Sequence, residues 1–106
     1  MASGILGQSA PTATTLTTLY TVPANNYAVV NLAVVNRGST ATTVRVALAA
    51  AATPTNAEYI EFDSSVPGNG VLERTGLVMD TGKRLVIYAG NANLSFSAYG
   101  IEQSTV

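Results

Sequence analysis

The sequence contains no cysteine, no histidine and no tryptophan. Without cysteine there can be no disulfide bond, cysteine zinc site or thiol catalysis, and without histidine the usual general base and commonest metal ligand are missing. Charged residues make up 10% of the chain, against about 25% in ordinary soluble domains. The net charge of −1 provides no basic excess for nucleic acid or an anionic membrane surface. These absences predict a protein that is not an enzyme and that binds no cofactor, nucleic acid or membrane.

Targeting signals are also lacking. The first ten residues contain no basic residue, which a secretory signal would require. The longest apolar run, residues 47–52, is mostly alanine and far shorter than the roughly 18 residues of a membrane span. We therefore expect a soluble protein made in the cytoplasm, and 106 residues leave room for one domain.

Short runs rich in Val, Ile, Thr, Tyr and Leu are separated by clusters of Gly, Pro and Asn. This spacing is typical of an all-β sandwich or barrel. Residues 49–56 are predicted to form a loop, with one helical turn as the alternative. The predicted strands are 16–22, 27–36, 42–48, 58–62, 71–79, 84–89 and 94–99. The fold class expected is all-β: a small antiparallel β-sandwich of about seven strands, jelly-roll or immunoglobulin-like in layout.

Three parts of the chain are expected: a flexible N-terminal arm (1–14), the β-sandwich domain (15–103) and a C-terminal tail (104–106). The arm is polar and small except for Ile5 and Leu6, and we expect it to dock these two side chains onto a neighbouring protein. The predicted core comprises Leu32, Val34, Val44, Val46, Leu48, Ile60, Phe62, Leu85, Ile87, Leu94 and Phe96.

The strand predicted over residues 27–36 is apolar on both faces, because only Asn31 interrupts the second face. A sheet with one wet face should alternate apolar and polar residues. The strand predicted at 84–89 is also apolar on both faces, because Val86 and Tyr88 alternate with the apolar residues on its other side. We therefore predict self-association through a face bearing Val29, Val35, Val86 or Tyr88, with covering by apolar loops as the alternative.

No catalytic, cofactor-binding or metal-binding residues are assigned. Glu61 and Asp63 would share one face of a regular strand and could together bind a cation, but a solvated strand edge is the favoured interpretation. Lys83 is the only lysine and would have to activate a hydroxyl group, although its turn position favours simple exposure. A sugar site built from Tyr59, Asn91 and Asn93 is a further alternative, with core or interface tyrosine favoured.

Several segments together resemble a family of small β-sandwich virion structural proteins of tailed bacteriophages. They are ILGQSA at 5–10, LYTVP at 19–23, AVVNLAVVNRG at 28–38, TVRVA at 43–47, YIEF at 59–62, RLVIYA at 84–89 and LSFSAYG at 94–100. The resemblance implies a non-enzymatic protein of the particle exterior, such as a capsid decoration or cement protein. Its expected location is the virion and its expected partners are itself, as a homotrimer by analogy with phage appendages, and the major capsid or other virion proteins. The alternative is a neck or tail appendage that binds a host glycan or receptor.

Overall fold

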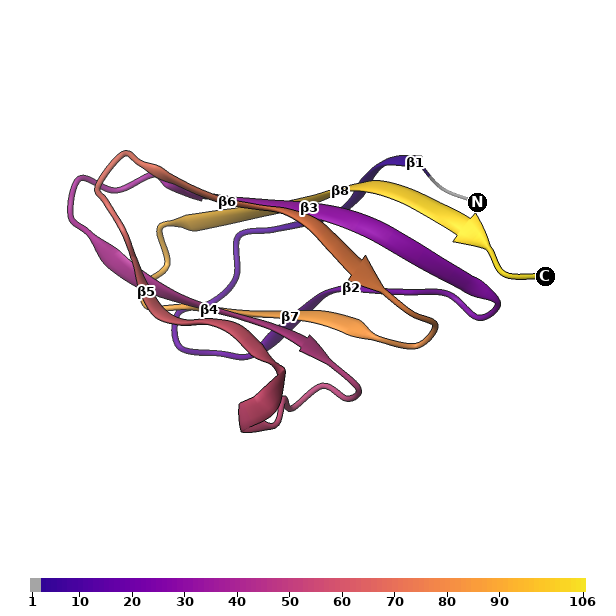
Figure 1. Ribbon diagram of the computed structural model, residues 1–106. Coiled ribbons are helices and arrows are strands. Elements are labelled where there is room, and N and C mark those ends of the chain that lie inside the picture. The colour runs from indigo at the N-terminus through magenta and orange to yellow at the C-terminus, as the bar shows by residue number, and fades with distance from the viewer. Residues whose placement is uncertain (1–2) are drawn as a thin grey trace.

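The computed structural model describes residues 3–106, which form two four-stranded antiparallel sheets packed face to face (Figure 1). Sheet A has the order β1-β8-β3-β6, and sheet B has the order β2-β7-β4-β5. The elements are β1 (Ser3–Ser9), β2 (Thr17–Thr21), β3 (Asn26–Asn36), β4 (Thr42–Ala49), the short 3₁₀ helix η1 (Asn56–Glu58), β5 (Tyr59–Val66), β6 (Val71–Met79), β7 (Arg84–Ala89) and β8 (Leu94–Ser104). No helix in this part of the chain has the length and apolar character needed to cross a membrane.

The pairing of the strands is nested. β1 pairs with β8, β2 with β7, β3 with β6 and β4 with β5, and the additional contacts β8–β3 and β7–β4 complete the two sheets. This arrangement is the eight-stranded jelly roll, in which two Greek keys fold over each other. The all-β sandwich prediction is therefore confirmed, and of the two layouts left open the chain adopts the jelly roll.

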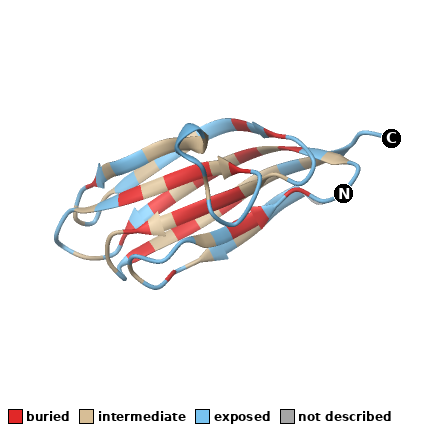
Figure 2. Ribbon diagram, turned by 90° about the horizontal axis from the view of Figure 1, so that it is seen from below, coloured by how far each residue is buried: buried red, intermediate tan, exposed pale blue. Residues whose placement is uncertain are grey.

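The hydrophobic core lies between the sheets and follows the period-2 pattern of the strands. In β3, the alternate residues Ala28, Val30, Leu32 and Val34 are fully buried. Figure 2 shows the same alternation as bands of buried and less buried residues along the strands. Most of the predicted core is confirmed, since eight of its side chains are buried: Leu32, Val34, Val44, Val46, Leu85, Ile87, Leu94 and Phe96.

The other three residues of the predicted core lie on or near β5. Leu48 and Ile60 are only partly buried, although both pack against the core. Phe62 is 56% exposed, so its assignment to the core is wrong. Two irregularities in the β4–β5 register shift the alternation of β5 and turn this ring outward.

The N-terminal segment differs from the prediction. Residues 3–9 form β1, an edge strand paired with β8, rather than part of a flexible arm. Leu6 packs against the core, and a β-carbon at Gly7 would lie 2.3 Å from the main-chain oxygen of Leu19. The segment therefore belongs to the sandwich, except for residues 1–2 of the predicted arm, which lie outside the described residues.

The connection between β4 and β5 folds back over the outer face of sheet B (Figures 1 and 2). Beneath it, Ala47, Ala49 and Val86 form a second small buried cluster, against which Tyr59 packs. The Glu58 carboxylate closes this connection by accepting hydrogen bonds from the backbone N–H groups of Thr55 (2.8 Å) and Ala50 (3.0 Å). These bonds lower the pKa of Glu58, because they favour its charged form.

The end of the sandwich opposite the two termini is held by Asn36, the only buried polar residue among residues 3–106. Its amide nitrogen donates to the carbonyl oxygens of Thr40 (2.9 Å) and Val66 (3.2 Å), and its amide oxygen accepts from the N–H of Gly38 (2.9 Å). One side chain thereby joins the β3–β4 turn to the end of β5. A buried amide with all these partners is satisfied and fixes the turn.

Candidate functional site

The outer face of sheet A carries an exposed apolar patch. In the strand register, Val29 lies between Ile101 on β8 and Val78 on β6, and in the neighbouring row Ile5 lies opposite Tyr99. Ile5 is 62% exposed and Val78 is 67% exposed. Side chains directly opposite on one face contact each other, so residues from all four strands form one continuous surface. We call these five residues the sheet A patch.

The rest of this outer face is almost uncharged. The remaining outward positions, read from the strand registers, are Ser3, Gln8, Tyr27, Asn31, Ala33, Val35, Val71, Glu73, Ser95, Ser97 and Gln103. Among them only Glu73 is charged. A wet face of an antiparallel sheet normally carries polar and charged residues at these positions. This outer face therefore has few charges and several exposed apolar residues: the sheet A patch lies toward one end, and Val35 and Val71 lie beside Ser95 at the other.

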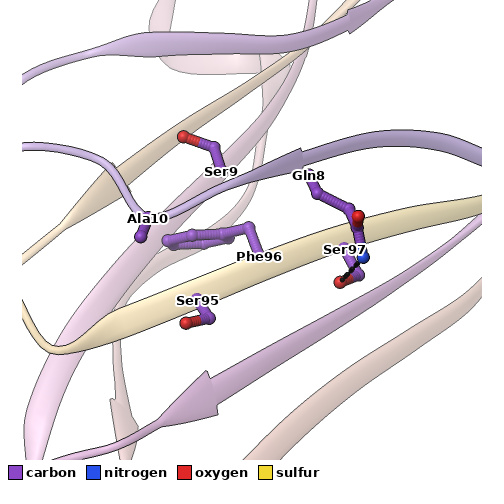
Figure 3. A pocket seen from close by; sticks show the side chains of 6 residues that line it. All are labelled: Gln8, Ser9, Ala10, Ser95, Phe96 and Ser97. Atoms are coloured by element: carbon purple, nitrogen blue, oxygen red, sulfur yellow. Dashed lines mark hydrogen bonds between the residues drawn. The ribbon is translucent and has the colours of Figure 1, made fainter.

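A shallow hollow lies at the end that carries Ser95, where β1 leaves β8 (Figure 3). It is lined by Gln8, Ser9, Ala10, Ser95, Phe96 and Ser97. The Gln8 amide donates a hydrogen bond to the Ser97 hydroxyl (3.3 Å), while the Phe96 ring lies toward Ala10. The lining contains neither an acid nor a base, so this hollow offers hydrogen-bonding groups to a partner surface but no residue for acid–base catalysis.

The four strand residues predicted to form one interface lie on opposite sides of the molecule. Val29 and Val35 face outward from sheet A, where Val35 is 38% exposed. Val86 is buried on the outer side of sheet B, under the β4–β5 connection, and Tyr88 contacts Arg45 on that same side. The four residues therefore lie on two faces, and Val86 is buried in a cluster on which Tyr59 packs, so it is not available for contact with another chain. Self-association through the other residues stays a prediction.

The two apolar residues of the predicted arm also separate. Ile5 points outward within the sheet A patch, whereas Leu6 packs against the core. Adjacent residues of a strand point to opposite sides of the sheet. Docking of both side chains onto a neighbour is therefore ruled out by this fold, and only Ile5 remains available for such a contact.

Tyr20 and Glu61 each make a side-chain contact that crosses from one sheet to the other. The Tyr20 hydroxyl on β2 donates a hydrogen bond to the Glu102 carboxylate on β8 (2.5 Å), and burial together with this carboxylate raises the pKa of Tyr20. Glu61 on β5 pairs with Arg74 on β6 and accepts a hydrogen bond from the Ser64 hydroxyl, which lowers its pKa. Each contact joins a strand of one sheet to a strand of the other, so both stabilise the sandwich.

The carboxylates of Glu61 and Asp63 do not share a site. Val44 pairs with Ser64 and Val46 with Glu61, so Phe62 and Asp63 both lie opposite the single residue Arg45. This β-bulge, with a positive φ of 53° at Asp63, breaks the alternation on which the prediction depended. Among residues 3–106 no group of three or more acidic side chains is placed to hold a metal ion.

The outer face of sheet B carries a cluster of aromatic rings around one arginine. The Arg45 guanidinium carbon lies 4.2 Å from the centre of the Phe62 ring and 4.6 Å from that of Tyr88, and Asp63 forms an ion pair with the same guanidinium. Tyr59 stands edge-on to Phe62. The sequence pattern gave no sign of this cluster, because the bulge that assembles it depends on pairing with β4.

The sugar site considered from the sequence is not assembled. Tyr59 pairs with Ala47 near one end of β4, whereas Ala89, just before the turn that holds Asn91 and Asn93, pairs with Val44 toward the other end.

Lys83 lies in the β6–β7 turn, as predicted, where its backbone N–H donates a hydrogen bond to the carbonyl oxygen of Asp80.

The chain matches no protein-family model, no curated protein and no solved structure. A functional assignment therefore depends on the two surfaces described above: the sheet A patch and the aromatic cluster of sheet B.

Proposed function

We propose that this chain is a non-enzymatic structural protein of a bacteriophage virion, which decorates or stabilises the exterior of the particle by self-association. The observation that carries the proposal is the almost uncharged, apolar outer face of sheet A. The jelly roll is consistent with it, because this architecture is common among viral capsid proteins. The resemblance of the sequence to phage virion proteins supports the part of the proposal that assigns the protein to a virion.

The outer face of sheet A is large enough to supply most of a self-association interface. Four strands spaced about 4.8 Å apart and about 30 Å long give a flat footprint of roughly 570 Å², and side-chain relief increases the accessible area. Stable complexes bury about 800 Å² on each partner. The face therefore supplies most of a standard interface, and Val78 and Ile5 are its most exposed large apolar residues.

Light scattering of the purified protein tests the self-association. We expect a homotrimer, with three times the monomer mass, and we expect Val78→Glu to give monomers because a charge would be desolvated in the interface. The control is Thr18→Glu, which places the same charge at an exposed residue of β2 in sheet B. The Thr18 variant should assemble and enter particles like the wild type, and the Val78 variant should do neither. A wild-type chain that stays monomeric at high concentration contradicts the proposal, as does an unchanged mass of the Val78 variant.

The alternative function, a neck or tail appendage that binds a host glycan or receptor, is favoured by a different observation. Such a protein needs an exposed aromatic or amide cluster, and the outer face of sheet B carries one at Tyr59 and Phe62. The two functions are compatible because they use opposite faces of the sandwich.

A further inference from the structure

The Phe62 ring is large, apolar and 56% exposed, yet it is held in place from two sides. The Arg45 guanidinium lies over the ring, and the Tyr59 ring meets it edge-on with 5.0 Å between centroids and an interplanar angle of 87°. Asp63 fixes the guanidinium in turn through Nε (2.7 Å) and Nη2 (3.3 Å). An exposed ring fixed in this way loses little conformational entropy when a ligand packs on it.

The backbone is bent to present this ring. The bulge in β5 directs both Phe62 and Asp63 toward Arg45, and it places Asp63 in the left-handed region, at a φ of 53°. A non-glycine residue in that region is uncommon and costs free energy. A regular strand would have turned Phe62 into the core, as its alternation with Ile60 predicts, so the bulge gives up core burial and exposes an aromatic surface.

A shallow hollow adjoins the ring and is lined by Asn56, Tyr59 and Phe62. Asn56 is the first residue of η1. The N–H groups of Ala50 and Thr55 donate hydrogen bonds to the Glu58 carboxylate and so close the connection that holds Asn56. Two aromatic side chains and one amide therefore border the same open hollow. The amide can both donate and accept hydrogen bonds.

The cluster has no net charge, because Asp63 compensates Arg45. The ion pair engages Nε and Nη2 of the guanidinium, and so leaves the donors on Nη1 to a ligand. The surface thus combines flat apolar rings with neutral or compensated hydrogen-bonding groups. A pyranose ring has the matching chemistry, with an apolar C–H face and hydroxyl groups around its rim.

We propose that the hollow at Asn56, Tyr59 and Phe62 is a binding site for neutral saccharides, in which a pyranose ring stacks on Phe62 and hydrogen-bonds to the Asn56 amide. An added β-strand is a poorer occupant, because the bulges of β5 interrupt the edge that it would pair with. The site specifies the ligand of the alternative function above, on which this inference rests. It lies on the side of the molecule opposite the sheet A patch and does not depend on self-association.

The test begins with an array of immobilised neutral and acidic glycans probed with the full chain. The neutral oligosaccharide with the strongest signal is then titrated into protein labelled at phenylalanine for NMR. The chain has two phenylalanines, so buried Phe96 serves as an internal reference for exposed Phe62. We expect the Phe62 ring signals to shift on titration and those of Phe96 to stay unchanged.

Variants identify the residues that carry the binding. Phe62→Ala should weaken it about tenfold or more, and Phe62→Tyr, which keeps the ring, should preserve it. Val106→Ala, at an exposed apolar residue outside both surfaces, is the matched control and should bind like the wild type. The proposal is overturned by an array without neutral hits, by binding to acidic glycans alone, or by unchanged affinity of the Phe62→Ala variant. Light scattering of the same samples keeps this result separate from the self-association proposal.

Discussion

Replacing Asn36 by alanine is expected to lower the free energy of unfolding by about 3 kcal/mol. The substitution removes three hydrogen bonds at once, those to the carbonyl oxygens of Thr40 and Val66 and that from the N–H of Gly38. A lost hydrogen bond costs about 0.5–1.5 kcal/mol when water can replace the partner, and about 1–3 kcal/mol when the group stays buried and unpaired. Val66 is fully buried, so its carbonyl group falls in the second class.

The expected loss is large for a domain of this size, whose total stability is about 5–15 kcal/mol. It corresponds to a decrease of roughly 12–24 °C in the unfolding midpoint. Asn36→Asp tests the donor role separately, because it keeps the acceptor for Gly38 but sets a carboxylate against two carbonyl oxygens. That environment raises the folded-state pKa of the new carboxyl group, so this variant should regain stability as the pH falls and the group is protonated.

Urea unfolding followed by circular dichroism measures both variants. Asn26→Ala is the control, because the Asn26 side chain makes one exposed hydrogen bond, to the carbonyl of Ala24 (2.9 Å), and its loss should cost at most about 1 kcal/mol. If Asn36→Ala is no more destabilising than Asn26→Ala, the reasoning is refuted, and the turns at this end of the sandwich do not depend on the buried amide.

Two further predictions concern β1 and the β4–β5 connection. Gly7→Ala should lower the free energy of unfolding in urea by about 1–3 kcal/mol, because the added methyl group would meet the Leu19 carbonyl. The control, Ser3→Ala at an exposed position, should leave the stability unchanged. Equal stabilities of the two variants would mean that β1 does not pack as described. Glu58→Gln should speed hydrogen exchange at the amides of Ala50 and Thr55, since one of the two carboxylate acceptors is lost. The wild type should lose the same protection in acid. The folded-state pKa of Glu58 is lowered, so the protection of these two amides, measured relative to their intrinsic exchange rates at each pH, is present above the unfolded value of about 4.3 and is lost as the pH falls through the folded value. Protection factors that stay constant over this pH range would contradict this role.

Most of the strands could be predicted because they combine β-branched or aromatic residues with clear turn residues between them. The predicted strand at 71–79 and that at 84–89 coincide with β6 and β7. β1 was missed because its sequence, SGILGQS, has one β-branched residue and two glycines. Its strand conformation comes from pairing with β8, a partner about 90 residues away that local pattern does not reveal.

The candidate site was predictable only in part. Alternation in β3 correctly placed Val29 and Val35 on the same outward side of the strand, where Asn31 is the only polar residue of the predicted strand. The pattern did not say that Val86 belongs to the other sheet and lies under a loop, because sheet membership is set by long-range pairing. The outward position of Phe62 was likewise hidden, since a bulge changes which residues share a face and is defined by two strands together.

The position of β8 has a consequence for how the protein is made. β8 lies between β1 and β3 in sheet A, and those two strands do not pair with each other. During synthesis β8 emerges after the other seven strands, so β1 has no partner strand until then and sheet A cannot close. Such non-local pairing slows folding. The jelly roll therefore completes only after translation of β8, and until that moment the apolar inner faces of β1 and β3 are exposed to contact with other chains.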